Sequence, residues 1–334
     1  MLRRKDKEHI EHLYLSKFAK KSDETRGRKF PEEPCEFRTE FQRDRDRIIH
    51  SKAFKRLMNK TQVFIRPFGD HFRTRLTHTI EVSGISRTIA NSLALNEDLT
   101  EAIALGHDLG HTPFGHSGED VMNKIYKKGF SHNKQSLRVV ETLELTKNRR
   151  GLNLTEEVRN GILNHTGKIK PSTLEGQIVK IADRIAYINH DIDDAIRAGI
   201  IEEKDLPKKC VEILGHSKTE RINTLVKDMI FESDGKFEIM QSRKKQNAMN
   251  ELRSFMTKEV YLNKKVKSFD AMQNVENIIT HLYEYYKKNR EEIAEEYIPL
   301  IDEDGIAEIA KDMVAGMTDR FAIKTYKDVF VPKY

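Results

Sequence analysis

The chain has 334 residues, enough for one large domain or two ordinary ones, because single hydrophobic cores stop growing near about 250 to 300 residues. Hydrophobic residues make up 37% and charged residues 34%, with no Trp and 8 Pro, which is typical of a helix-rich globular protein and excludes a chain disordered throughout. The net charge of +6 is a small surplus of 59 basic over 53 acidic residues, so it excludes a polybasic tail.

Cysteine usage and hydropathy indicate the compartment. Cys35 and Cys210 are the only cysteines, and their separation supports neither a thiolate metal site nor a disulfide framework. The first residues, MLRRKDKEHIEHLYLSKF, contain no apolar run of signal length, and no stretch approaches the roughly 18 consecutive apolar residues of a membrane helix. We therefore expect an unprocessed cytoplasmic protein with no membrane partner.

In chain order, the first break in helical pattern covers residues 21–35, where charges, a glycine and two prolines predict an exposed loop after an N-terminal helix. Residues 37–60 are predicted to be helical. Residues 61–72 (TQVFIRPFGDHF) are β-branched and aromatic and are interrupted by Pro67 and Gly69, so they are the best candidate for a short hairpin.

Three later stretches have the 3.6-residue apolar period of amphipathic helices, namely residues 74–95, 99–108 and 176–199. Gly199 is a plausible C-terminal stop for the last one. Beyond about residue 200 the chain is rich in Lys, Glu, Leu, Ile and Tyr at helical spacing. These patterns predict an all-α fold.

We predict three parts along the chain. Residues 1–35 form the N-terminal helix and exposed loop, residues 36–200 form the core that carries the chemistry, and residues 201–334 form a helical extension packed on that core. The boundary falls in the short linker GIIEEKDLP, between Gly199 and Asp205.

Histidines are concentrated in one short part of the chain. Six of the thirteen lie between residues 71 and 132: His71, His78, His107, His111, His116 and His132. A single histidine is more often a hydrogen-bonded core or surface residue than a functional one. Six within less than a fifth of the chain indicate a functional site.

Four residues have the chemistry of divalent metal ligands, which are neutral imidazoles and ionised carboxylates that converge on one point. They lie in the amphipathic segments RLTHTIEV, ALGHDLG and KIADRIAY and are His78, His107, Asp108 and Asp183. An alternative interpretation pairs His107 with His111 as in the zinc-protease pattern H-E-x-x-H, but this chain has Asp108 where that pattern needs Glu, and Gly110 interrupts the helix.

The ordered set H … HD … D resembles the HD-domain metal-dependent phosphohydrolases. The strings RLTHTIEV, HDLGHTPFGHSGE, SHNKQSLRVVE and ADRIAYINHDIDDA are together similar to the deoxyguanosine triphosphate triphosphohydrolase branch of that superfamily. The resemblance spans about residues 38–200, and the long ordered set is far more specific than the HD pair alone.

The resemblance implies hydrolysis of a deoxynucleoside triphosphate (dNTP), with dGTP among the expected substrates, to a deoxynucleoside and tripolyphosphate by attack at the α-phosphorus. A divalent ion (Mn, Mg, Fe, Co, Ni or Zn) would polarise phosphate oxygens and acidify water. Arg75 and Arg56 match positions that face phosphates or substrate in relatives. Without the resemblance, an ordinary surface charge and a substrate contact are equally good interpretations of each arginine.

The resemblance also implies roles for the remaining polar residues. His116, Glu119 and His132 would form the acid–base group, with one histidine protonating the departing 5′ oxygen and Glu119 holding a histidine in its tautomer. His111 would contact substrate or orient a metal ligand.

Three further residues are assigned to the sugar by the same resemblance. Tyr187 and Asp191, four residues apart on one helix face, would contact sugar and phosphate, including the 3′ hydroxyl. Gln62 would help close the pocket against a 2′ hydroxyl. The alternative is a polar pair on a helix face with the tyrosine packed in the core.

Two other functions stay open at this point. An HD phosphohydrolase with the same site could act on a nucleoside monophosphate, a cyclic nucleotide or a guanosine polyphosphate. A nonenzymatic alternative is a nucleotide-controlled protein that binds single-stranded nucleic acid, which the basic surplus and some relatives favour. A homo-oligomer is also expected, whereas the compact C-terminal part argues against allosteric nucleotide sites.

Overall fold

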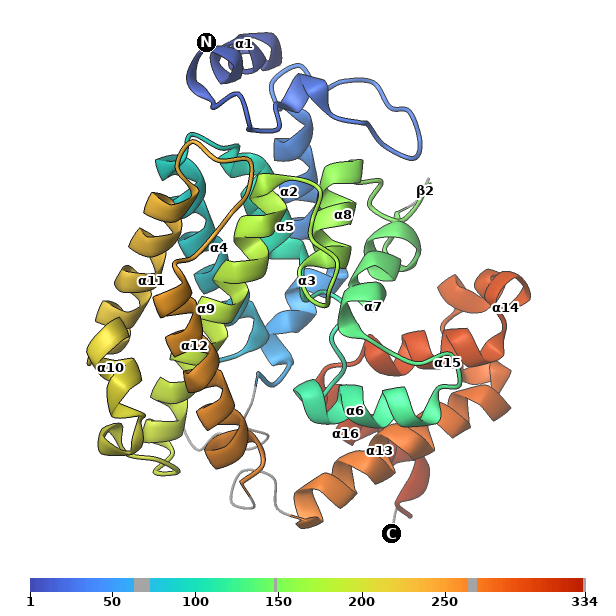
Figure 1. Cartoon of the computed structure of the whole chain (residues 1–334). Helices are drawn as coiled ribbons and strands as arrows, with labels where there is room; N and C mark the ends of the chain where they lie inside the picture. The colour runs from blue at the N-terminus through green and yellow to red at the C-terminus, as the bar shows by residue number, and fades with distance from the viewer. Residues whose placement is uncertain (63–72, 147–148, 264–268, 333–334) are drawn as a thin grey trace. The chain divides into compact units, whose positions relative to one another are not determined.

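The computed structural model describes residues 1–62, 73–146, 149–263 and 269–332, and their regular secondary structure is almost entirely helical (Figure 1), which confirms the all-α prediction. In this part of the chain the strands are β1 (Leu145–Thr146) and β2 (Arg149–Arg150), an antiparallel pair that the sequence analysis did not predict. The hairpin expected over residues 61–72 lies outside the described residues from position 63 onward. At its base, Thr61 forms an isolated antiparallel bridge with Thr74.

The chain divides into two compact units that alternate along the sequence. The first unit comprises residues 1–49, 78–107 and 153–266, and the second comprises residues 50–77, 108–152 and 267–334. One change of unit falls at the peptide bond between His107 and Asp108. The three-part division expected at residues 35 and 200 stays a prediction.

The elements assigned here to the first unit are α1 (Arg4–Tyr14), η1 (Ser22–Glu24), α2 (Glu40–His50), α4 (Arg75–Ser92), α5 (Glu97–Gly106), α8 (Glu156–Asn164), α9 (Leu174–Arg197), η4 (Glu203–Asp205), α10 (Lys208–Leu214), α11 (Lys218–Ser233), α12 (Arg243–Met256) and the π-helical η5 (Thr257–Tyr261). Those of the second unit are α3 (Lys52–Arg56), η2 (Leu57–Asn59), α6 (Gly115–Ile125), α7 (His132–Arg138), the π-helical η3 (Val139–Leu143), β1, β2, α13 (Phe269–Lys288), η6 (Arg290–Glu292), η7 (Glu295–Tyr297), α14 (Ile298–Asp304), α15 (Ile306–Ala315) and α16 (Asp319–Phe330). Among the described residues, no helix is both long enough and apolar enough to cross a membrane.

The core of the first unit is built around α5, which packs against α8 and α9 and is buried over almost its whole length. Glycines let α5 and α8 approach closely. A Cβ on Gly106 would lie 2.6 Å from the Ile162 side chain, and one on Gly161 would lie 2.5 Å from that of Ile103. This packing fixes the C-terminal end of α5, where His107 follows the helix.

Helix α9 begins and ends two residues before the predicted stretch 176–199. Thr173 caps its N-terminus, because the hydroxyl oxygen accepts a hydrogen bond from Gly176 N at 3.1 Å. The helix ends at Arg197, and Gly199 follows with a φ of 65°, a left-handed conformation that glycine adopts without strain. Asp183 and Asp191 both lie on this helix.

In the second unit, α13 packs against α6, α15 and α16. Helix α6 starts from an unusual turn, because Phe114 and Gly115 both have positive φ, 62° and 58°. Helix α7 lies directly on the preceding loop: a Cβ on Gly110 would fall 2.1 Å from Ser136 N, and Gly110 N donates to the Ser136 hydroxyl at 2.9 Å.

The segment 21–35 was expected to be an exposed loop, and the structure corrects this for part of it. Lys21 and Ser22 are buried, and the Arg28 guanidinium forms ion pairs with Glu40 and Asp44, the latter fully buried. Long-range ion pairs of this kind follow from tertiary packing and leave no local pattern in the sequence.

Candidate active site

Three helices of the first unit bring together His78, His107 and Asp183. His78 lies on α4, His107 follows α5, and Asp183 lies on α9. The Nε2 atoms of His78 and His107 are 3.1 and 3.8 Å from Asp183 Oδ1. Both histidines are almost fully buried, whereas 18% of the Asp183 side chain is exposed.

The local geometry sets the state of two of these groups. His107 Nδ1 donates to the Ala104 carbonyl at 2.6 Å, so the other ring nitrogen, Nε2, is the one that faces Asp183. Burial raises the pKa of the Asp183 carboxyl, but the hydrogen bond with His78 and the charges of His107, His78 and His165 outweigh it and lower that pKa to about 2. Asp183 is therefore a carboxylate at neutral pH.

This donor set fits a divalent metal ion. Two imidazole Nε2 atoms each lie within 4 Å of one ionised carboxylate oxygen, and imidazole with carboxylate oxygen suits first-row divalent ions. The hydrogen bond from His107 Nδ1 to a backbone carbonyl is the arrangement that usually orients a ligating histidine.

Three residues beside this set were missed by the sequence analysis: Glu81, His165 and His190. The His165 ring lies 5.0 Å from the His107 ring, and its Nδ1 donates to the Ile162 carbonyl at 2.7 Å. His190 Nδ1 lies 3.0 Å from a Glu81 carboxylate oxygen. A sequence signal existed for each histidine: His165 directly follows a helix as His107 does, and His190 lies two helical turns after Asp183.

Asp108 follows His107 in the chain and belongs to the second unit. Its carboxylate pairs with Arg75 Nη1 at 2.6 Å, and both side chains are almost completely buried. Arg75 is therefore not a surface charge. A charge-assisted pair of this kind fixes the orientation of both side chains.

The second unit also gathers His111, His116, Glu119 and His132 around one carboxylate. Glu119 lies in the first turns of α6, and its oxygens are 2.9 and 3.0 Å from His132 Nδ1 and 3.3 Å from His116 Nδ1. His132 N also donates to Glu119 at 2.8 Å. The His111 ring stacks on that of His132 with centroids 4.7 Å apart. The structure thus brings together the residues expected to form the acid–base group.

The protonation states in this group differ. Burial lowers the pKa of His132, but its hydrogen bond with Glu119 and the negative charge of that carboxylate raise it above the usual value. Burial and the Arg75 charge hold the pKa of His111 well below the usual value. Burial opposes ionisation of Glu119, yet its hydrogen bonds with His116 and His132 lower its pKa. Glu119 is therefore a carboxylate that favours the protonated form of His132, beside a His111 ring that favours the neutral form.

Two of the three residues assigned to the sugar, Tyr187 and Asp191, lie on α9, and Asp191 has a partner that was not predicted. The Tyr261 hydroxyl, from η5, donates to Asp191 Oδ2 at 2.5 Å. Burial raises the pKa of Tyr187 to about 12 against the charges of Arg253 and Arg184, and burial together with the Asp191 charge raises the pKa of Tyr261. Both phenols are therefore hydrogen-bond donors at neutral pH. Tyr261 was missed because it lies 70 residues beyond Asp191, in a segment with no motif.

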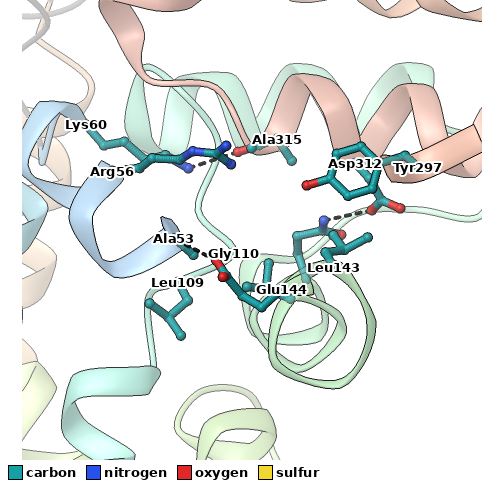
Figure 2. Close-up of a pocket in the computed structure, with 13 residues that line it drawn as sticks. Ala53, Arg56, Lys60, Leu109, Gly110, Leu143, Glu144, Tyr297, Asp312 and Ala315 are labelled. Atoms are coloured by element: carbon teal, nitrogen blue, oxygen red, sulfur yellow. Dashed lines mark hydrogen bonds between the residues drawn. The ribbon is translucent and has the colours of Figure 1, made fainter. Parts of the chain in front are cut away.

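Gln62 and Arg56 lie in the second unit, on either side of Lys60. Gln62 is buried, and its Oε1 has no hydrogen-bond partner among the described residues. Arg56 and Lys60 line a pocket together with Glu144, Tyr297 and Asp312, and Figure 2 shows both cations at the Ala315 side of it. Burial and the nearby charge of Arg56 lower the pKa of Lys60 to about 7.

Comparison with known proteins agrees with this assembly of histidines and carboxylates. The family model of the HD domain matches residues 75–188, and that of the phosphohydrolase-associated domain matches residues 239–328. A phosphohydrolase of solved structure from Bacteroides thetaiotaomicron has a TM-score of 0.54 over 85% of this chain and 68% of its own, at 17% identity, which supports the fold alone.

Full-length relatives narrow the family. A deoxyguanosinetriphosphate triphosphohydrolase-like protein of Caldanaerobacter subterraneus is 54% identical over 97% of this chain and 95% of its own length. A protein of the same name from Clostridium perfringens is 51% identical over 99% and 98%. The chain belongs to this deoxyguanosinetriphosphate triphosphohydrolase-like family of HD-domain proteins, and it is a metal-dependent phosphohydrolase.

Proposed function

We propose that the protein hydrolyses a dNTP, with dGTP as the first substrate to test, to a deoxynucleoside and inorganic tripolyphosphate. Water attacks the α-phosphorus, the bond to the 5′ oxygen breaks, and that oxygen leaves with one proton. The observation that supports the proposal is that the histidines face their carboxylates through different ring nitrogens. His78 and His107 turn Nε2 toward Asp183, whereas His132 turns Nδ1 toward Glu119. The substrate class comes from the printed names of the relatives.

His78, His107 and Asp183 would hold the divalent ion, and Asp108, next to His107 in the chain, remains the expected fourth ligand. When bound, the ion supplies a Lewis acid for the phosphate oxygens and for water. Arg75 and Arg56 would neutralise the triphosphate. Arg75 is suited to this because its guanidinium is already held in place by Asp108.

His132 is the proposed general acid. Its Nδ1–H is held by Glu119, and Nε2–H of the imidazolium would protonate the departing 5′ oxygen. The raised pKa of His132 favours the protonated ring that this role needs. His116 shares the same carboxylate and its side chain is 65% exposed, so it can exchange protons with solvent. Neutral His111 would pack against the reacting groups.

Asp191, Tyr187 and Gln62 would select the sugar. The Asp191 carboxylate accepts a hydrogen bond from Tyr261 and would also accept one from a 3′ hydroxyl. Gln62, which is buried, would help close the pocket against a 2′ hydroxyl.

The test is a product analysis. Metal-supplemented protein is incubated with each of the four dNTPs and the four ribonucleotides in ¹⁸O-labelled water, and products are separated by ion exchange. We expect a deoxynucleoside and tripolyphosphate, with the label in tripolyphosphate, and little turnover of ribonucleotides. Asp183→Ala, prepared in parallel, controls for contaminating phosphatases. Release of pyrophosphate or single phosphates, or turnover only of monophosphates, cyclic nucleotides or guanosine polyphosphates, would contradict the proposal.

A further inference from the structure

Asp319 is not part of the acid–base group, but its carboxylate links the two segments that carry Gln62 and His116. Asp319 is the first residue of α16. Its Oδ2 accepts hydrogen bonds from Thr61 N at 3.1 Å and from the Thr61 hydroxyl, and its Oδ1 accepts one from Phe114 N at 3.0 Å. The carboxylate is therefore shared between the residue that precedes Gln62 and the turn that precedes His116.

The turn that Asp319 holds is strained. Phe114 has a φ of 62°, which a bulky residue adopts only where its surroundings impose it, and its side chain is 3% exposed. Gly115 follows with a positive φ, and a Cβ there would lie 2.9 Å from the Gln62 carbonyl oxygen and 3.3 Å from Arg75 Nη2. The first turn of α6 therefore packs closely against Gln62 and against Arg75.

Lys60 makes a second link between the same parts. Its ammonium donates to the Ala315 carbonyl at 2.9 Å, as Figure 2 shows, and to the His111 carbonyl. The Lys60–Thr61 segment, the His111–Phe114 loop and the end of α15 with the start of α16 are therefore tied by two buried or half-buried side chains. We call these two side chains, Lys60 and Asp319, the brace.

We propose that Asp319 is a positioning residue for the hydrolytic reaction: it holds the Phe114–Gly115 turn so that α6 presents His116 and Glu119 beside Gln62 and Arg75. This inference rests on the proposed function for its kinetic consequence only. Asp319 itself touches no reacting atom. Because misplacement of reacting groups by about 1 Å can cost about a hundredfold in rate, its loss should act on turnover.

The test compares Asp319→Ala and Asp319→Asn with Asp328→Asn, which removes the same charge from the same helix at a residue that pairs with Lys324. In Asp319→Ala we expect kcat to fall about tenfold to a hundredfold, with KM and bound metal within twofold of wild type. Asp319→Asn, which keeps one acceptor oxygen, should lose less. Asp328→Asn should match wild type. Unchanged kcat in Asp319→Ala, or a loss that falls equally on KM and metal content, would overturn the proposal.

Hydrogen–deuterium exchange separates this inference from the proposed function, because it needs no substrate. Peptides that cover residues 112–120 should exchange faster in Asp319→Ala than in Asp328→Asn, since Phe114 N loses its acceptor. If wild type released no tripolyphosphate, the proposed function would fail while faster exchange would still support the brace. Unchanged exchange would overturn the brace whatever the substrate.

Discussion

Both units place histidines against a carboxylate, but they turn different ring nitrogens toward it. In the first unit, His78 and His107 approach Asp183 through Nε2, and His107 Nδ1 is occupied by a backbone carbonyl. In the second unit, His132 and His116 approach Glu119 through Nδ1. The first arrangement gathers two Nε2 atoms around one carboxylate oxygen and suits a metal, whereas the second suits His132 for moving a proton.

The pKa values of three carboxylates in this protein shift for two different reasons. Asp183 and Glu119 are ionised because histidines offset the cost of burial. Glu175, at the start of α9, is fully buried and accepts hydrogen bonds from the backbone N–H groups of Lys20 and Asn96, and burial raises its pKa to about 7. Neighbouring imidazoles therefore keep Asp183 and Glu119 acidic, whereas backbone N–H groups do not offset the burial of Glu175.

The largest expected effect is on the metal set. His107→Ala and Asp183→Ala should lose bound metal and lower kcat by a thousandfold or more, because a metal ion supplies several kcal/mol of transition-state stabilisation at about 1.4 kcal/mol per tenfold. Metal content by mass spectrometry and tripolyphosphate release measure both, and Asp193→Ala on the same helix should retain both. Full metal content in the two variants would remove His107 and Asp183 from the ligand set.

Loss of the proposed general acid should act on turnover alone. His132→Ala should lower kcat about 10² to 10⁴-fold, the usual contribution of general acid catalysis, and keep its metal, because Glu119 and not a ligand carboxylate holds its ring. His281→Ala, in the same unit but stacked on Tyr326, is the matched control. If His132→Ala lost metal as His107→Ala does, His132 would belong to the metal ligands and not to the acid–base group.

Glu175 provides a test of the burial cause through stability. Its folded-state pKa of about 7 lies above the ordinary 4.5, so the folded state holds the proton more tightly, and this contribution to stability is present below pH 4.5 and lost as pH rises through 7. At 1.36 kcal/mol per pKa unit, the shift from 4.5 to about 7 corresponds to a change in folding free energy of about 3 kcal/mol as an upper bound. Glu175→Gln should therefore unfold in more urea than wild type at pH 8, with the difference shrinking toward pH 5. An equal difference at both pH values would contradict the raised pKa, and exposed Glu238→Gln should show no pH-dependent gain.

The smallest effect concerns sugar selection. Asp191→Ala should lose a charge-assisted hydrogen bond to the 3′ hydroxyl, about 1.5 to 3 kcal/mol, and so slow dNTP hydrolysis roughly tenfold to a hundredfold. A 2′,3′-dideoxynucleotide lacks that hydroxyl, so wild type should discriminate against it and Asp191→Ala should do so much less. Tyr261→Phe keeps the carboxylate and should keep most of the discrimination. Full discrimination in Asp191→Ala would make Asp191 a structural residue of α9.

The sequence by itself determined the helical class, the position of α9 to within two residues and the ordered set of histidines and carboxylates, because apolar periodicity and motif spacing are local properties of the chain. The family resemblance drawn from those motifs is confirmed by full-length relatives. The roles of the individual site residues, the homo-oligomer and the nucleic-acid partner stay predictions.

Only the tertiary structure decided which ring nitrogen of each histidine faces a carboxylate, since this depends on side-chain rotation against distant groups. It also decided the partners that lie far away in the chain, such as Tyr261 for Asp191 and Asp319 for Phe114. The alternation of the two units, with a change at the bond between His107 and Asp108, could not be predicted for the same reason. Long-range contacts are set by how the helices pack, and one chain's local pattern does not encode them.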